Sequence, residues 1–169
     1  YRLRRAALTA LGRYPIEVDR IRLLYHGFNT TFRVDAADGR RFALRLNVNS
    51  RKTVANLHAE MAWLVALALD TELPVPEPQP TRDGALHTNV FMAGLGRELP
   101  VAMLSWLPGR DIEDPTVESM RALGRLTATL HEHATTWSLP PGAELPGIDT
   151  VLMGLPYRLD IDHPLLTPE

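Results

Sequence analysis

Alternating apolar and polar residues mark three short stretches in the first third of the chain. They predict strands over residues 21–27, 30–36 and 41–47, because successive side chains of a strand point to opposite faces. In the third strand the two faces differ in character: one carries Phe42, Leu44 and Leu46, and the other carries Ala43, Arg45 and Asn47. The Asp38-Gly39 pair before it is typical of a tight hairpin turn.

Three other stretches place apolar residues at three- and four-residue spacing, which predicts amphipathic helices. They cover residues 2–12, about 53–69 and about 115–134. Ser50 or Thr53 can cap the second helix. Asp114 can cap the third, with Pro115 in its first turn.

Two further strands are predicted near residues 86–92 and 101–107, with a turn or loop between them. Before them, alternate prolines over residues 74–80 predict an extended connector. The order is therefore helix, three strands, helix, two strands, helix. One helix between the third and fourth of five strands favours an antiparallel sheet with helices at one side, an α+β fold.

Composition narrows the function classes without naming one. The chain has 169 residues, a formal net charge of −2 and no cysteine, so a nucleic-acid groove, a disulfide framework and a thiolate metal site are not indicated. Its apolar runs are shorter than the roughly 18 residues of a membrane span. The basic N-terminal stretch reads as a short amphipathic helix rather than a targeting signal, which predicts a cytoplasmic protein. Lys52 is the one lysine among 18 basic residues.

The stretch LLYHGFNTTFRV, residues 23–34, interrupts a strand with Gly27 and Asn29 and resumes it at once. Either a β-bulge or a backbone that approaches a ligand closely explains such a break. Arg45 on the third strand and Glu60 in the following helix form an ion pair, or each is an ordinary solvated charge. The residues alone leave both pairs of interpretations open.

Two histidine-containing clusters are not interpreted as metal sites. His131-Glu132-His133 lacks the H-E-x-x-H spacing of a zinc-protease helix, so we interpret His131 as a packing or capping residue. Asp160, Asp162 and His163 have no glycine turn or further acid after them, which favours a solvated loop.

Six segments taken together are more specific than any one of them. They are HGFNTTFRV, RFALRL, HAEMAWLVAL, LPVPEPQPTRDG, AMLSWLPGRDI and LGRLTATLHEH, and they span about residues 20–133. In order and spacing the chain resembles the aminoglycoside phosphotransferase family, within the wider choline kinase and homoserine kinase-like group. The resemblance implies a protein-kinase-like nucleotide-binding lobe with a five-stranded antiparallel sheet and a packed helix over residues 1–108. Residues 109–169 would then be the hinge exit and the beginning of a helical lobe.

The resemblance also implies roles for particular residues. A loop over the ATP phosphates would comprise Gly27, Phe28, Asn29 and Thr30, although the full G-x-G-x-x-G pattern is absent. Arg45 falls where these kinases place a phosphate-binding lysine, and Glu60 would hold it in position. In the hinge, the Ser105 carbonyl and the Leu107 amide would bind adenine.

The catalytic signature of the family is an Asp followed five positions later by an Asn that binds Mg²⁺. No Asp of this chain has an Asn five positions later. We therefore expect the front part of an ATP-dependent kinase of a small-molecule hydroxyl, with its Mg²⁺ ligands beyond Glu169 and no activity on its own. A non-catalytic nucleotide-binding module and an α+β domain that binds no nucleotide are the alternatives. The acceptor is open among aminoglycosides, choline-like alcohols, homoserine and sugars; neither nucleic acid nor a membrane is expected as a partner.

Overall fold

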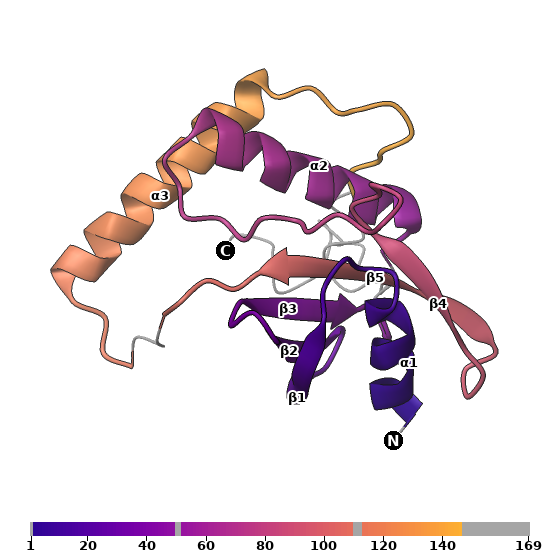
Figure 1. Cartoon of the computed structure of the whole chain (residues 1–169). Helices are drawn as coiled ribbons and strands as arrows, with labels where there is room; N and C mark the ends of the chain where they lie inside the picture. The colour runs from indigo at the N-terminus through magenta and orange to yellow at the C-terminus, as the bar shows by residue number, and fades with distance from the viewer. Residues whose placement is uncertain (1, 50–51, 110–112, 147–169) are drawn as a thin grey trace, which may run out of the picture.

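The computed structural model describes residues 2–49, 52–109 and 113–146, and these contain three helices and five strands (Figure 1). Asp160, Asp162 and His163 lie outside the described residues. The elements, in chain order, are α1 (Arg2–Leu11), β1 (Val18–His26), β2 (Thr30–Ala36), β3 (Arg41–Leu46), α2 (Val54–Asp70), β4 (Thr88–Met92), β5 (Arg97–Ser105) and α3 (Val117–Thr136).

The five strands form one antiparallel sheet in the order β1-β2-β3-β5-β4. Between β2 and β3 the predicted turn is present, with Gly39 at φ +85°, a left-handed conformation that favours glycine. β5 begins at Arg97 rather than near residue 101, because Met92 already pairs with Arg97 across a short turn. The predicted α+β class is confirmed, and the sheet is the five-stranded antiparallel one that was expected.

The two faces of the sheet carry different helices, as Figure 1 shows. On one face α1 lies against β4 and encloses the larger core, which includes the fully buried Tyr14, Val34, Leu44 and Leu46. On the other face Leu57 and Met61 of α2 pack on Ala102 and Leu104 of β5. Burial of a large apolar side chain stabilises the fold by about 1.5–3 kcal/mol, so Leu57 and Met61 hold α2 on the sheet. The buried residues of α1, among them Leu11, hold that helix in the same way.

Capping boxes start both long helices. Thr53 caps α2, as predicted: its side chain accepts from the Asn56 amide, and the Asn56 side chain accepts from the Thr53 amide. The prediction of Asp114 as the cap of α3 is wrong, because Thr116 caps it in the same reciprocal arrangement with Ser119. A residue that closes two hydrogen bonds with its neighbour three positions on outcompetes an isolated aspartate two residues earlier.

α3 projects away from the sheet, and the C-terminal end of α3 meets α2 (Figure 1). None of its described residues is buried, and Met120, Leu123 and Leu126 of its apolar face are exposed. After α3 the chain returns to the start of α2, where Ala143 is buried and the Glu144 amide donates to the Ala55 carbonyl. None of the described helices combines the length and apolar character that crossing a membrane requires.

Candidate functional site

The loop between β1 and β2 is held by hydrogen bonds to a residue that follows β3. The Gly27 amide donates to the Asn29 carbonyl at 2.9 Å and closes a tight turn. Asn49 donates its side-chain amide to the Gly27 carbonyl at 2.8 Å and its backbone amide to the Phe28 carbonyl at 2.9 Å. Asn49 therefore anchors the loop, a role that the sequence analysis did not assign to it.

Gly27 lies close to the exposed ring of Tyr25, which can move aside, and its own backbone conformation does not require glycine. Its φ is not among the positive values of the described glycines, but a Cβ at this position would lie 2.6 Å from the Tyr25 hydroxyl oxygen. The pairing of β1 with β2 also shifts register between Leu23 and Tyr25, so a bulge precedes the glycine. The bulge interpretation of this stretch is thus present in the structure, and the close approach is that of Tyr25.

The other loop residues differ in their exposure. Phe28 is 55% exposed and Thr30 is fully buried, with its hydroxyl 2.7 Å from His26 Nδ1. The Asn29 side-chain oxygen is buried and has no hydrogen-bond partner among the described residues. An unpaired buried acceptor carries a desolvation cost, which a hydrogen-bond donor of a bound molecule would remove.

Arg45 and Glu60 form the ion pair that was expected. The Arg45 Nη2 lies 2.7 Å from the Glu60 Oε1, and the two side chains are 19% and 24% exposed. Lys52 Nζ lies 3.3 Å from the other carboxylate oxygen, so Glu60 bridges two cations. The Arg45 Nε is buried without a hydrogen-bond partner in the described structure.

The register of the sheet brings this pair to the loop. Arg45 is the cross-strand partner of Thr31, one residue after the loop residue Thr30. Lys52 joins the site from the connection between β3 and α2. The sequence analysis did not assign it to the site, although its status as the one lysine of the chain could have drawn attention to it. The site therefore has two cations around one carboxylate beside a loop that ends at Thr30.

The predicted hinge is attached to the proline-rich connector. The Ser105 amide donates to the Glu77 carbonyl at 2.8 Å, and the Ser105 hydroxyl accepts from the Glu77 amide at 2.9 Å. Ser105 pairs with Phe42 at the opposite end of β3 from Arg45, three residues or about 10 Å away along the strand. Leu107, beyond the end of β5, is 42% exposed.

A second polar group was missed by the sequence analysis. Arg33 holds Asp35 in a two-point ion pair at 2.8 and 3.0 Å, and Arg41 lies 3.5 Å from the same carboxylate. The Arg33 hydrogen bond is the main cause that lowers the pKa of Asp35 below its ordinary value. These side chains alternate with buried residues of β2, which places them on the face of the sheet that carries Arg45.

No group of three potential metal ligands occurs within residues 2–49, 52–109 and 113–146. Of the two roles expected for His131, packing is wrong because His131 is exposed, and capping stays a prediction. His133, two positions on, is the histidine whose side chain is nearly buried, at 7% exposure.

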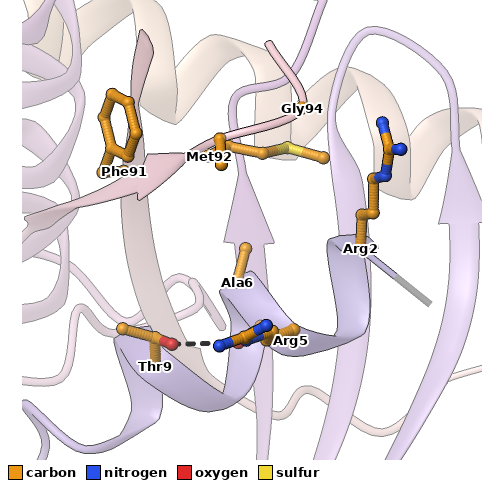
Figure 2. Close-up of a pocket in the computed structure, with 8 residues that line it drawn as sticks. Arg2, Arg5, Ala6, Thr9, Phe91, Met92 and Gly94 are labelled. Atoms are coloured by element: carbon orange, nitrogen blue, oxygen red, sulfur yellow. Dashed lines mark hydrogen bonds between the residues drawn. The ribbon is translucent and has the colours of Figure 1, made fainter. Parts of the chain in front are cut away.

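A further groove in the described structure lies elsewhere. It has a volume of about 720 Å³ between α1 and β4, on the α1 side of the sheet, whereas Arg45 and Glu60 lie on the α2 side. Figure 2 shows Arg2, Arg5 and Thr9 of α1 along one wall and Phe91, Met92 and Gly94 along the other. The groove is therefore separate from the predicted nucleotide site.

Solved structures of two kinases share this fold. A microcompartment-associated aminopropanol kinase superposes with a TM-score of 0.71 at 28% sequence identity, over 85% of this chain and 44% of that chain. Amicoumacin kinase hAmiN, solved in complex with AMP-PNP, Ca²⁺ and Ami, superposes with a TM-score of 0.67 at 19% identity, over 84% and 42%. The matched part of the chain thus covers less than half of either kinase.

Sequence comparison gives the family directly. No curated protein sequence matches the chain significantly. The model of the phosphotransferase enzyme family (APH) matches residues 20–168, nearly the whole chain. The sheet, its packed helix and the two kinase structures agree with that match. The chain belongs to the phosphotransferase enzyme family, and its five-stranded antiparallel sheet with helices matches the N-terminal lobe of kinases.

Proposed function

We propose that this chain is the nucleotide-binding part of an ATP-dependent kinase that phosphorylates a hydroxyl group of a small molecule. The observation that carries the proposal is the 2.7 Å ion pair between Arg45 and Glu60 beside the loop of residues 27–30, in a chain of the phosphotransferase family. Such kinases hold the phosphates of ATP with loop amides and one cation that an acid from the packed helix keeps in place.

Arg45 would bind a phosphate oxygen with the donors that Glu60 does not use. A guanidinium has five N–H groups in a fixed planar arrangement, and Glu60 engages the one nitrogen Nη2. The Arg45 Nε is a buried donor without a partner among the described residues, which an anionic oxygen would satisfy. Lys52 would add a second positive charge near the same phosphates, since it shares the Glu60 carboxylate.

The loop that would cover the phosphates comprises Gly27, Phe28, Asn29 and Thr30. Asn49 holds this loop through hydrogen bonds to the Gly27 and Phe28 carbonyls. The adenine would bind at the hinge, to the Ser105 carbonyl and the Leu107 amide. The separation of about 10 Å along β3 between Ser105 and Arg45 suits a nucleotide that lies along this strand.

Mg²⁺ would accompany the nucleotide, as Ca²⁺ accompanies AMP-PNP in the amicoumacin kinase structure. The described residues contain no cluster of acids or histidines that fits this metal, so no step through it is derived from them. The metal ligands and the catalytic aspartate would belong to the part of the kinase after this chain. We expect this chain to bind ATP without turning it over. The alternative function is a module that binds nucleotide and phosphorylates no substrate. This alternative predicts that the gene encodes no Asp-x-x-x-x-Asn after Glu169.

Titration calorimetry with a non-hydrolysable ATP analogue tests the site. Loss of a charge-assisted phosphate contact costs about 1.5–3 kcal/mol, so Arg45→Ala should weaken binding about 10- to 150-fold. Arg4→Ala is the matched control, because Arg4 is an exposed arginine of α1, on the other side of the sheet. Equal affinity of the Arg45→Ala variant and the parent chain would rule out the proposed site.

A further inference from the structure

One imidazole joins α3 to two places on α2. The Trp63 indole donates from Nε1 to His133 Nδ1 at 3.0 Å, and His133 Nε2 lies 3.0 Å from Asp70 Oδ2. His133 belongs to α3, whereas Trp63 and Asp70 belong to α2. We call these three residues the His133 bridge. It spans 70 positions of sequence on one side and 63 on the other.

The hydrogen bonds of the His133 bridge select one tautomer. An indole N–H is a donor only, so the Nδ1 that accepts it carries no proton. The remaining proton of the neutral ring is then on Nε2, which donates it to the Asp70 carboxylate. Both ring nitrogens are satisfied by this single arrangement, and the ring itself is 7% exposed.

Aromatic packing reinforces the bridge at the end of α3. The Trp63 ring lies 6.5 Å from the His133 ring and 6.2 Å from the Trp137 ring, both at an interplanar angle of 40°. Trp137 is the C-cap of α3, and its amide donates to the His133 carbonyl. The end of α3 is therefore fixed to α2 by two rings as well as by hydrogen bonds.

The bridge lies on the stripe of α2 that carries Glu60. Residues three or four positions apart are neighbours on a helix surface, and Asn56, Glu60 and Trp63 follow that spacing. Asp70 lies about two turns after Trp63 on the same side of the helix. Trp63, one turn after Glu60, is held by His133. Asn56, one turn before it, donates its side-chain amide to the Glu144 carbonyl at 2.9 Å. Glu60 is thus held between two attachments of α2 to the chain that follows the hinge.

From this arrangement we propose that Trp63 and His133 are positioning residues, which set α2 so that Glu60 keeps Arg45 directed at the nucleotide phosphates. The inference rests on the proposed nucleotide site. Packed helices shift by sliding over one another, and any such shift of α2 would move the Glu60 carboxylate away from Arg45. The attachments at Asn56 and Trp63, one turn on either side of Glu60, oppose this movement. Coupling of this kind between packed elements amounts to a few-fold change in affinity for each residue.

The test measures the affinity for the same ATP analogue in conservative variants of the bridge. His133→Phe keeps an aromatic ring and loses both hydrogen bonds, and Trp63→Phe removes the indole donor. We expect each to weaken binding about three- to tenfold with circular dichroism unchanged. His133→Asn should restore affinity to within about twofold of the parent chain, because its amide oxygen can accept from Trp63 in place of Nδ1.

His133→Gln is the matched control for His133→Asn, since its longer amide replaces Nε2 toward Asp70 and leaves the Trp63 indole without an acceptor. It should remain as weak as His133→Phe. Parent-like affinity of both Trp63→Phe and His133→Phe, alongside a weakened Arg45→Ala variant, would overturn the positioning role and leave the nucleotide site standing. Parent-like affinity of Arg45→Ala would instead remove the nucleotide site, and this inference with it.

A spectroscopic measurement remains informative if a variant folds poorly. The chain contains three tryptophans, so 5-fluorotryptophan labelling gives three ¹⁹F resonances, which single substitutions assign. Coupling between sites is reciprocal, so addition of the ATP analogue should shift the Trp63 resonance along the same binding curve that calorimetry gives. The same titration in the Arg45→Ala variant should shift it only at correspondingly higher concentration. A Trp63 resonance that stays unmoved at saturation refutes the inference.

Discussion

Replacement of Glu60 by glutamine tests the central ion pair with little change of shape. The substitution keeps an oxygen that can accept from Arg45 Nη2, now 2.7 Å away, and removes the negative charge. It also leaves Lys52 without the carboxylate at 3.3 Å, so two cations face each other across a neutral amide. The fold should survive, because Glu60 lies beside the packed face of α2 and not within its core.

The degree of burial sets the expected size of the effect. Exposed ion pairs contribute about 0.2–1 kcal/mol, and breaking a buried one costs about 3–5 kcal/mol. Arg45 and Glu60 are 19% and 24% exposed, but Lys52 is 46% exposed and well screened by solvent. We therefore expect Glu60→Gln to lower the free energy of unfolding by about 1–2 kcal/mol, which for a chain of this length lowers Tm by about 2–8 °C.

Nucleotide affinity gives the sharper result, since two physical effects oppose each other. Without Glu60 the Arg45 side chain is free to move, and immobilising such a side chain on binding costs about 0.5–1.5 kcal/mol, or about two- to twelvefold in affinity. Removal of a negative charge near phosphate would instead favour binding by Coulomb attraction. We expect the loss of positioning to outweigh the Coulomb gain. Salt and solvent screen the Coulomb gain, whereas a neutral glutamine amide holds the Arg45 side chain less firmly than the Glu60 carboxylate does.

Urea unfolding followed by circular dichroism measures the stability, and calorimetry with the ATP analogue measures the affinity. Glu72→Gln is the matched control, because Glu72 is an exposed acid just after α2. An affinity of Glu60→Gln that equals or exceeds that of the parent chain would show that Glu60 does not position Arg45. A stability loss no larger than that of Glu72→Gln would show that the ion pair does not contribute to the fold.

Three further predictions concern the fold that presents the site. Thr53→Ala should destabilise the protein by about 1 kcal/mol in urea unfolding, because it breaks the capping box with Asn56; an unchanged midpoint contradicts this. Leu44→Ala should cost about 2–5 kcal/mol, since Leu44 is fully buried, whereas Leu69→Ala, at a position 79% exposed, should cost little; similar losses for the two would refute the assignment of the core. Burial lowers the pKa of His87 below its ordinary 6.5, so the folded protein binds this proton less tightly than the unfolded chain. The free energy of unfolding should be at its full value above pH 6.5 and fall as the pH drops through the folded pKa, and His87→Gln should flatten that part of the pH profile.

Local pattern determined the elements and the faces of this protein. Alternation placed Leu44 and Arg45 on opposite faces of β3, because the side-chain period of a strand leaves no other choice. Which helix covers each face was decided by the tertiary structure. The Thr53 cap and the Asp38-Gly39 turn were also predictable from local sequence, because their hydrogen bonds close within a few residues. Where two local signals competed, as at the start of α3, the reciprocal pair of Thr116 and Ser119 prevailed over the prediction.

Tertiary structure alone decided which further residues meet at the site. Asn49 and Lys52 follow β3 in segments without periodic pattern, and they reach the loop and Glu60 only because the sheet and α2 bring them there. His131 and His133 are equivalent in sequence context, yet only His133 faces α2. α3 has no buried residue to fix its rotation from its own pattern, so the contact with Trp63, 70 positions away, makes that choice. Sequence periodicity reports on neighbours along the chain, whereas these contacts depend on how distant elements cross.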